Sequence, residues 1–406
     1  MQTKAQQIRI ILTAVLGWML DSFDFCVMLF VVTDVAAEFH VGITAVTWAV
    51  TATLFLRVFG AAIFGALADR FGRKPLLIAN TLAFSVCEVA SGFSPSLGAF
   101  LMLRALYGIA MGGQWGIATS WTIESIPANW RGWASGLLGA GYSVGYLLAG
   151  LFYGFAHDAL GWRGMFIVAA LPALVVIGLA ASAPESPIWR TQSHKPKQST
   201  ALILRSNWKL SAYAVILMFA AATMSHGTQD LYPVMLRVQH GLNAHELATV
   251  ASVYSIGGIL GCLFGGSLSQ KIGRRRELVL ASALMLVLMP FWGLCTGLVA
   301  LTVTAFLMQF LVQCSFGTIP AHLNEMSPPG IRGTFPGVAF QFGNMLAAGN
   351  ATLQSVLADK LDKNYGVALS VIAAAGALAF CLLAYWGPDK CNVEMGDDVA
   401  ERRPSA

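Results

Sequence analysis

The segment "GALADRFGRK", Gly65 to Lys74, has a second copy, "GSLSQKIGRR", at Gly266 to Arg275, displaced by 201 residues. Another pair of segments, "ESIPANWRG" at 124–132 and "EMSPPGIRG" at 325–333, lies at the same displacement without a gap. Two unrelated motifs at one spacing indicate an internal repeat. The sequence therefore predicts a chain built from two similar halves.

Long apolar segments recur along the whole chain. The protein is 56% hydrophobic and 11% charged, with a mean hydropathy of +0.66, whereas soluble domains are about 25% charged. Many of these segments approach the roughly 20 residues that a helix needs to cross a bilayer. They lie near residues 10–36, 44–68, 75–93, 98–122, 133–155, 164–183, 211–236, 246–269, 277–297, 299–323, 333–358 and 366–387. This pattern predicts an all-α membrane protein with twelve transmembrane helices.

The repeat divides the twelve predicted helices into two groups of six. We expect an N-terminal half at residues 1–184, a cytoplasmic linker at 185–209, a C-terminal half at 210–388 and a cytoplasmic tail at 389–406. Because each group contains an even number of crossings, the two halves should have the same orientation in the membrane. Such parallel repeats relate the two halves of one large class of transporters.

Basic residues predict the orientation of the chain. If the N-terminus is cytoplasmic, 19 of the 25 Lys and Arg residues fall on the cytoplasmic side and four on the opposite side. This asymmetry favours cytoplasmic termini and accounts for the net charge of +5 without nucleic-acid binding. The seven cysteines form no CxxC spacing, so neither a disulfide framework, a metal site nor a cofactor is predicted. The expected partner is the lipid bilayer.

The loop at 65–74, with its degraded copy at 266–275, resembles the conserved loop of the major facilitator superfamily. "RALYGIAMGG" from Arg104 and "PESPIWR" from Pro184 resemble its fourth-span and sixth-span motifs. The resemblance implies a monomeric transporter that works by alternating access, with a site at the midplane between the halves. It assigns conformational gating to Gly65, Asp69, Arg70, Gly72, Arg73, Arg104, Glu124, Arg131, Arg274, Glu325 and Arg332. In the second copy Gln270 replaces Asp69, so the contact there should be weaker.

Charged residues inside predicted spans are expensive and mark candidate functional sites. Arg57 lies near the middle of its span, and its planar fork matches a carboxylate. We therefore expect it to bind an anionic substrate, the alternative being a structural ion pair with Asp21, Asp24 or Glu88. These three carboxylates are candidate proton carriers, because burial disfavours the charged form.

The segment "MSHGTQD", Met224 to Asp230, places polar residues inside an apolar run. "SHGTQDLYP" from Ser225 resembles the span-seven signature of the sialate:proton symporter family, which includes lactate and pyruvate:proton symporters. Ala222 and Val234 depart from that signature, which puts the exact substrate in doubt. His226 and Asp230 share a helix face and form a titratable pair that can relay one proton. Gln229 adds a neutral hydrogen-bonding group.

Further substrate contacts are expected from spans five and eleven. Gln341 and Asn344 are three residues apart on one face, and Tyr142 and Ser143 lie at or beside the matching positions of the first half. By resemblance Gln341 and Asn344 contribute to a carboxylate site, and the alternative is hydrogen bonding between helices.

The predicted function is proton-coupled symport of a small monocarboxylate such as lactate or pyruvate in a bacterial inner membrane. The substrate and protons are then the partners. The alternatives are a sialic acid:proton symporter, a drug:proton antiporter or a non-transporting membrane receptor. No nucleophile–base spacing, metal cluster or phosphate loop points to an enzyme.

Overall fold

The computed structural model of the protein describes residues 3–41, 43–192 and 200–391, which form helices and the turns between them. Residues 193–199 of the predicted linker and 392–406 of the predicted tail lie outside the described residues. The boundaries proposed for the halves, the linker and the tail stay predictions.

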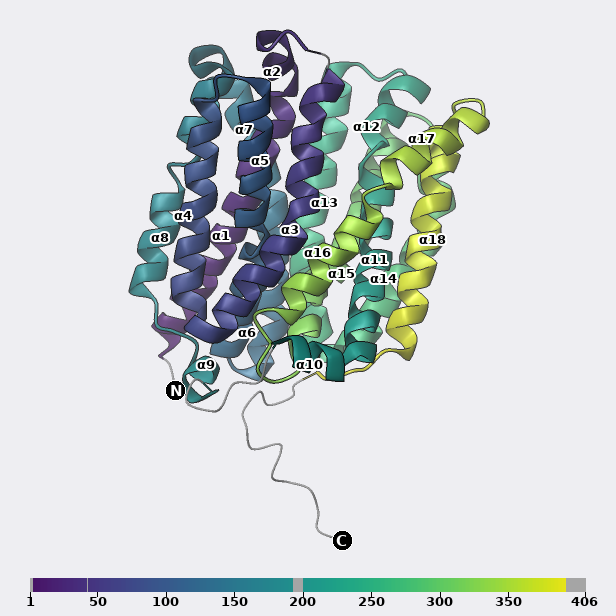
Figure 1. Cartoon of the computed structure of the whole chain (residues 1–406). Helices are drawn as coiled ribbons and strands as arrows, with labels where there is room; N and C mark the ends of the chain where they lie inside the picture. Colours follow the sequence, from purple (N-terminus) through teal and green to yellow (C-terminus); the bar gives the residue numbers. More distant parts are fainter. Residues whose placement is uncertain (1–2, 42, 193–199, 392–406) are drawn as a thin grey trace.

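The N-terminal half runs from purple to teal in Figure 1. Its helices are α1 (Lys4–Phe30), α2 (Val32–Glu38), α3 (Ile43–Phe71), α4 (Arg73–Gly92), α5 (Leu97–Gly112), α6 (Gln114–Ser125), a short 3-10 turn (Ala128–Trp130), α7 (Arg131–Ala169) and α8 (Ala173–Ser182). The short helices α9 (Pro187–Gln192) and α10 (Thr200–Ser206) follow at the lower end of the molecule.

The C-terminal half runs from teal to yellow and stands beside the first. Its helices are α11 (Trp208–Gln229), α12 (Tyr232–Val234), a π-helical turn (Met235–Gln239), α13 (Ala244–Ile272), α14 (Arg274–Leu294), α15 (Leu298–Met326), α16 (Phe335–Ala347), α17 (Asn350–Lys360) and α18 (Tyr365–Trp386).

Nine helical segments of the described chain are long and apolar enough to cross a membrane. One of them, Ala128–Ser182, has 55 residues, more than twice the roughly 20 that one crossing needs, and Gly161 interrupts it with a φ of 60°. Two further crossings are broken helices, formed by α5 with α6 and by α16 with α17. The architecture thus accommodates the twelve predicted crossings.

The predicted span at 211–236 falls within the membrane-length segment Trp208–Gln239, and its helix is interrupted near Asp230. α11 ends at Gln229, and Asp230 and Leu231 separate it from α12. The physical reason is Pro233, which has no N–H to donate and whose ring clashes with the carbonyl four residues earlier, at Gln229. The interruption therefore lies directly after the polar segment that contains His226.

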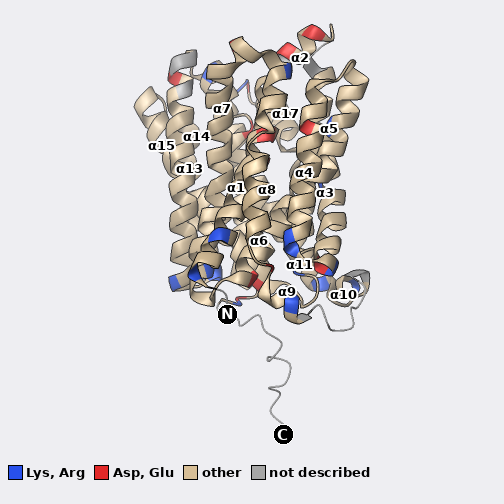
Figure 2. Cartoon of the chain, turned by 90° about the vertical axis from the view of Figure 1, so that its left-hand side faces the viewer, with Lys and Arg blue, Asp and Glu red and all other residues tan. Residues whose placement is uncertain are grey.

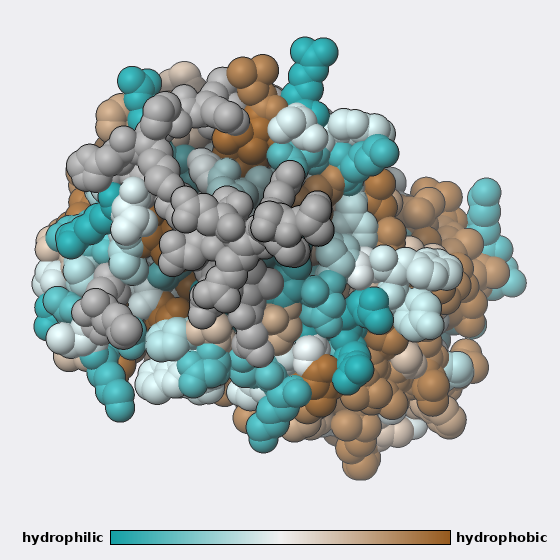
Figure 3. Space-filling view, turned by 90° about the horizontal axis from the view of Figure 1, so that it is seen from below, coloured by the Kyte–Doolittle hydropathy of each residue, from teal (hydrophilic) through white to brown (hydrophobic). Residues whose placement is uncertain are grey.

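Basic residues gather at one end of the molecule. α1 begins and α18 ends there (Figure 1), and the Lys and Arg residues concentrate there in Figure 2. We call it the basic end; it includes Arg73, Arg131, Arg274 and Arg332. Seen from below, hydrophilic residues occupy much of this face, while hydrophobic residues cover part of the flank (Figure 3). Such a division suits a protein whose sides face lipid and whose ends face water.

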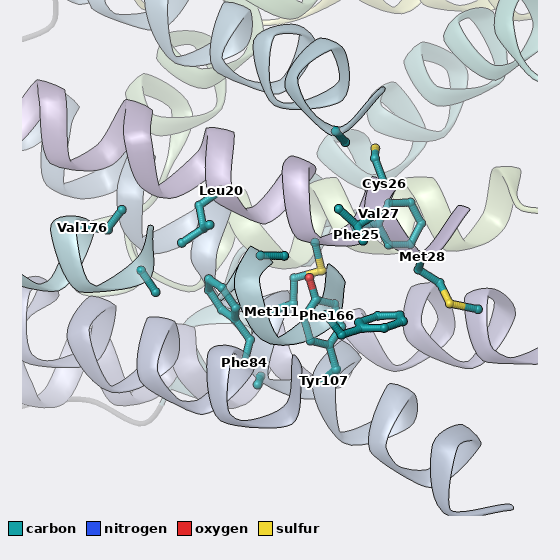
Figure 4. Close-up of a cluster of buried hydrophobic side chains, with 14 of the residues drawn as sticks. Leu20, Phe25, Cys26, Val27, Met28, Phe84, Tyr107, Met111, Phe166 and Val176 are labelled. Carbon is teal, nitrogen blue, oxygen red and sulfur yellow. The ribbon is translucent and has the colours of Figure 1, made fainter. Parts of the chain in front are cut away.

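Each half packs its own hydrophobic core. The first core is built by α1 to α8 and contains Leu20, Phe84 and Tyr107 (Figure 4). The second is built mainly by α11 to α18, and Trp18 and Trp115 of the N-terminal half join it. The two tryptophans therefore place part of the first half against the core of the second.

At the opposite end, α2 is tied to the start of the sixth predicted crossing. The Glu38 carboxylate accepts hydrogen bonds from Arg163 Nη2 at 2.7 Å and Arg163 Nε at 2.9 Å, and Trp162 Nε1 also donates to it. The bonds from Arg163 hold the pKa of Glu38 below its usual range. This contact joins two segments of the N-terminal half and leaves the relation between the halves to other contacts.

The two halves touch closely where α7 meets α13. A Cβ added to Gly136 would overlap the carbonyl of Cys262, and one added to Gly266 would overlap the carbonyl of Gly132 and the backbone of Gly136. Small residues let helix backbones approach in this way inside a membrane. The interface therefore brings backbone against backbone, with little side-chain interlocking at these positions.

Candidate functional site

Asp69 joins the halves at the basic end. Its carboxylate accepts hydrogen bonds from the backbone N–H of Gly333 at 2.7 Å, from the N–H of Thr334 at 3.0 Å and from Thr334 Oγ1 at 2.7 Å. Thr334 is the residue before α16, so the carboxylate lies at the N-terminus of that helix, where the helix dipole favours negative charge. Asp69 also pairs with Arg73 Nη2 at 3.0 Å.

Behind Asp69, two further carboxylates hold Arg73. Its Nε and Nη2 atoms donate to Glu124 at 3.2 and 2.8 Å, a bidentate geometry that is among the strongest side-chain contacts. Glu185 accepts from the backbone N–H of Arg73 at 3.0 Å, at the start of α4. Gly72 reaches this turn with a φ of 111°, in the left-handed region that favours glycine.

The second half repeats this arrangement at the spacing of the sequence repeat. Arg274 Nε and Nη2 both donate to Glu325 at 3.0 Å, and Gly273 has a φ of 95°. Gln270 Oε1 accepts from the N–H of Gly132 at 2.9 Å, the counterpart of the bond from Gly333 to Asp69. We call Asp69, Arg73, Glu124, Gln270, Arg274 and Glu325 the basic-end network.

The remaining predicted gating residues divide into two groups. Gly65 packs against the Thr334 backbone, Arg131 lies 3.9 Å from Glu325, the carbonyl of Arg332 accepts from Ser120 Oγ, and Arg70 is exposed. These four residues lie at the basic end. Arg104 lies apart from them, inside the core of the N-terminal half.

That core contains a group of buried charges. Arg104 Nη2 pairs with Glu88 Oε2 at 2.8 Å, and Arg57 Nη2 pairs with Asp21 Oδ2 at 2.7 Å. All four side chains are at most 6% exposed. Removing one member of such a buried pair costs about 3–5 kcal/mol, because the other charge is left unpaired. The pairs are therefore structural as well as candidate functional elements.

Asp24 differs from the other two carboxylates of this group. It is fully buried, and neither of its carboxylate oxygens has a hydrogen-bond partner in the described part of the chain. Asp21 and Glu88 are its electrostatic neighbours on the acidic side and Arg104 on the basic side. A buried carboxylate without a partner is costly to charge, so Asp24 has the setting of a proton-binding group.

The polar side chains at the end of α11 are partly accessible to solvent. His226 Nδ1 and Asp230 Oδ1 are 3.0 Å apart, and their side chains are 42% and 30% exposed. Asn344 of α16 lies beside His226, and its Nδ2 donates to the carbonyl of Phe340 at 3.0 Å. Gln229 Nε2 donates to Ser225 Oγ at 2.7 Å. The structure thus brings a titratable pair and an amide together on two adjoining helices.

Aromatic rings from both halves meet beside these polar residues. Phe340 of α16 stacks on Trp115 of α6 with ring centroids 4.2 Å apart. Trp18 of α1 lies 6.3 Å from Phe340 and 5.5 Å from Tyr142 of α7. Since Phe340 is one helical turn from Asn344, the rings adjoin the polar group.

Not every predicted substrate contact lies in this region. Tyr142 belongs to the aromatic group, and Ser143 lies beside Gly258 of α13. Gln341 is 3% exposed, and its Nε2 has no hydrogen-bond partner among the described residues. Arg57 is 5% exposed and held by Asp21, the structural ion pair that the sequence left open, although the pair acts electrostatically on Tyr142.

Sequence reasoning missed three parts of the site. Thr334 follows the repeated Arg-Gly directly, and Glu185 lies in the quoted "PESPIWR", so both could have been found from the motifs. Nothing in the sequence distinguishes the stacked pair of Trp115 and Phe340 from ordinary core aromatics, because it depends on how the halves meet.

The model of the Major Facilitator Superfamily matches residues 13–352. The chain belongs to this superfamily. The protein is therefore a membrane transporter, and it is not an enzyme, since its curated relatives in the superfamily are named transporters.

Curated transporters of the superfamily resemble the chain along most of its length. The sialic acid transporter NanX of Escherichia coli is 26% identical, over 96% of this chain and 95% of NanX. A carboxylic acid transporter protein homolog of Saccharomyces cerevisiae is 27% identical, over 88% of this chain and 64% of that longer protein. A putative niacin/nicotinamide transporter, NiaP of Bacillus subtilis, is 26% identical over 97% and 99%.

A solved structure of the superfamily has the same fold. The proton:xylose symporter XylE, bound to 6-bromo-6-deoxy-D-glucose, superimposes with a TM-score of 0.81 over 96% of this chain and 98% of XylE. At 18% sequence identity this likeness speaks for the fold alone.

The contacts of Asp69 generate a prediction about turnover. Asp69→Asn keeps the size of the side chain but replaces one acceptor oxygen with a donor that faces the N–H groups of Gly333 and Thr334. We expect the maximal transport rate to fall several-fold, because the free energy of activation rises by about 1–2 kcal/mol. KM should change little, because the loop is remote from the predicted midplane site. Initial rates measured against substrate concentration check this.

The repeat supplies the control for this prediction. Gln270→Ala removes the neutral counterpart and its bond to Gly132, so it should slow transport less than Asp69→Asn does. A large rise in KM at an unchanged maximal rate would show that Asp69 does not act through the conformational cycle.

Proposed function

We propose that the protein is a proton-coupled symporter of a small organic monocarboxylate, of the lactate or pyruvate type. The observation that carries the proposal is the pair of His226 and Asp230, which is titratable, accessible and adjacent to the amide of Asn344. A protonated imidazole and an amide N–H donate the hydrogen bonds that a carboxylate accepts. Asp230 shares the proton of the pair, so binding of the anion and of the proton are linked.

Arg57 gives the proposal a second element. Its guanidinium holds Asp21 in this conformation, and its Nε has no partner among the described residues. A substrate carboxylate would replace Asp21 on Arg57, while the pair of His226 and Asp230 carries the coupled proton. One anion and one proton would then enter together without moving net charge, so a pH gradient rather than the membrane voltage would drive uptake.

The relatives support an acid as substrate. Their printed names include sialic acid, carboxylic acid, niacin and cis,cis-muconate. The resemblance of "SHGTQDLYP" to the sialate:proton symporter signature adds to this support, and sialic acid is the alternative substrate.

The departures from the sialate signature favour a smaller molecule than sialic acid. A polyol needs many hydrogen-bonding groups, and Ala222 and Val234 offer none. Gln114 is buried and already accepts from Asn80 at 2.9 Å. The half-buried rings of Tyr142 and Phe340 both lie against Trp18, and Phe340 is one helical turn from Asn344. Drug:proton antiport and a receptor role lack a comparable observation.

The location follows from charge. We propose a bacterial inner membrane protein, monomeric, with the basic end in the cytoplasm, because basic residues are retained on that side. Asp69 and Gln270 join the halves at the basic end, so this conformation would receive substrate from the opposite, external side.

Uptake into proteoliposomes tests the function. With the lumen more alkaline than the medium, we expect accumulation of labelled lactate or pyruvate, and little without the gradient. Unlabelled lactate and pyruvate should compete for uptake of the label, whereas sialate should not. Accumulation of sialate in place of lactate would select the alternative substrate, and no gradient-dependent uptake of any acid would reject the proposal.

Asp230→Asn tests the proton path. The amide cannot ionise but has nearly the same size, so packing is preserved. We expect accumulation driven by the pH gradient to be lost, while exchange of internal for external substrate survives in part, because exchange does not require the carrier to lose its proton. His226→Ala should impair both, since it also removes a substrate contact.

The matched comparison uses Asp24→Asn, Asp21→Asn and Glu88→Gln in the same two assays. If Asp24 carries the proton instead, Asp24→Asn will show the exchange-only behaviour and Asp230→Asn will accumulate substrate like the parent. That pattern would assign the coupling proton to Asp24 of α1 instead of Asp230.

Arg57→Lys tests the anion site. Lysine keeps the charge but lacks the fork that can serve two acceptors. We expect most uptake to be lost, at least tenfold, which corresponds to about 1.4 kcal/mol. Arg57→Gln should be no better, and thermal unfolding of both variants controls for loss of the buried pair with Asp21. Parental transport by Arg57→Gln would mean that Arg57 does not bind the substrate.

A further inference from the structure

His322 lies in α15 at the basic end, and its side chain is only 2% exposed. Neither ring nitrogen has a hydrogen-bond partner among the described residues. A neutral imidazole has one donor and one acceptor, and burying both without partners costs free energy.

The internal repeat shows that this histidine is an addition to the second half. The residue at the matching position of the first half is Trp121, whose indole N–H donates to the carbonyl of Pro184 at 3.2 Å. The neighbouring buried acid Glu277 corresponds to Leu76. The second half has therefore lost the acid at position 270 and gained titratable groups behind its part of the network.

Most of the charged groups around His322 are paired with one another. Arg274 of α14 and Asp389, which follows α18, act on the ring with opposite signs. Arg274 is bound by Glu325, one turn along the helix from His322. Burial and the nearby guanidinium disfavour a charged imidazole in this conformation, and Asp389 is the counter-ion available to one.

The other packed elements add few charges. From α7, Arg131 faces Glu325 at 3.9 Å. From α13, the groups in this network are the neutral Gln270 and Ser269, both of which accept from Arg274. Beyond α18, the Cys391 thiol acts on Arg274 and Glu325. Glu277 completes the set on α14 and lies one turn from Arg274.

We propose that His322 is a proton-binding site of the basic end, without its proton while the halves are joined and protonated when that end opens. The proposal rests on the alternating-access transport proposed above. Opening moves α7 away from α13 and α15, so water reaches the ring and the imidazolium can be hydrated beside Asp389. The open state then binds more protons than the closed one, and acid on this side favours the open state.

A regulatory effect follows for a proton symporter. Protons released at the basic end would hold that end open and slow the return of the empty carrier. Uptake would therefore decline as its own product acidifies that side, before the driving gradient is exhausted.

The amides that bridge the halves test the proposal. The N–H groups of Gly132, Gly333 and Thr334 donate across the interface, so their hydrogen exchange measures opening of the basic end. The full-length protein in lipid nanodiscs is exchanged between about pH 5.5 and 8, where histidine titrates, and rates are corrected for intrinsic exchange. We expect protection to fall on acidification, by up to about tenfold per pH unit for one linked proton.

His322→Gln keeps a donor and an acceptor but cannot titrate, so its corrected protection should not change over this range. If this variant fails to fold, His322→Trp restores the residue of the first half and should behave the same way. Asp69 and Glu277 are carboxylates that could also produce a pH dependence. If His322 is responsible, Asp69→Asn and Glu277→Gln should still lose amide protection on acidification.

Two results would overturn the proposal. One is a parent protein whose corrected protection is independent of pH. The other is a His322→Gln variant with the parental pH dependence, which would assign the effect to a carboxylate. Because the measurement needs no substrate, it can fail while gradient-driven uptake persists, and it can succeed in a protein that transports a different solute.

Discussion

A guanidinium held by two carboxylate oxygens at the start of a membrane helix is the contact on which this architecture depends. Arg73 with Glu124 and Arg274 with Glu325 are the same contact made twice, and each fixes the turn between two crossings. The positive φ of Gly72 and Gly273 brings each arginine into place. Only with these turns fixed can Asp69 reach the N-terminus of α16 and Gln270 reach Gly132. The contact between the halves is thus a consequence of contacts within each half.

Charged side chains in the interior are also paired. A bilayer offers no water to a buried ion, so Arg57 and Arg104 each take a carboxylate from a neighbouring helix. Asp24 has no such partner among the described residues, whereas His226 and Asp230 face accessible space. The protein therefore presents two different environments for a proton, one enclosed in α1 and one reachable on α11. Their separation is what makes the comparison of the carboxamide variants informative.

Much of this could be predicted from the sequence because its signals are local or periodic. Apolar length predicts the crossings, the spacing of 201 predicts the repeat, and the separation of four positions between His226 and Asp230 predicts their contact. The ion pair of Arg57 joins residues 36 apart in the chain, and helix rotation decides whether Asp21, Asp24 or Glu88 is the partner. The burial of His322 likewise depends on α14, α7 and the segment after α18. Pro233 predicts the break after Gln229, but the length of the apolar run favoured a single uninterrupted span.

The glycine contact between α7 and α13 sets how the halves can move. Backbones touch at Gly132, Gly136 and Gly266, and the side chains of Arg274 and Gln270 also lie against Gly132. At Gly136 and Gly266 the two helices can part without any change of rotamer, because backbone lies against backbone there, whereas at Gly132 the side chains of Arg274 and Gln270 have to be released. The rate of alternation is then left to the polar contacts at the basic end and to whatever binds between the halves.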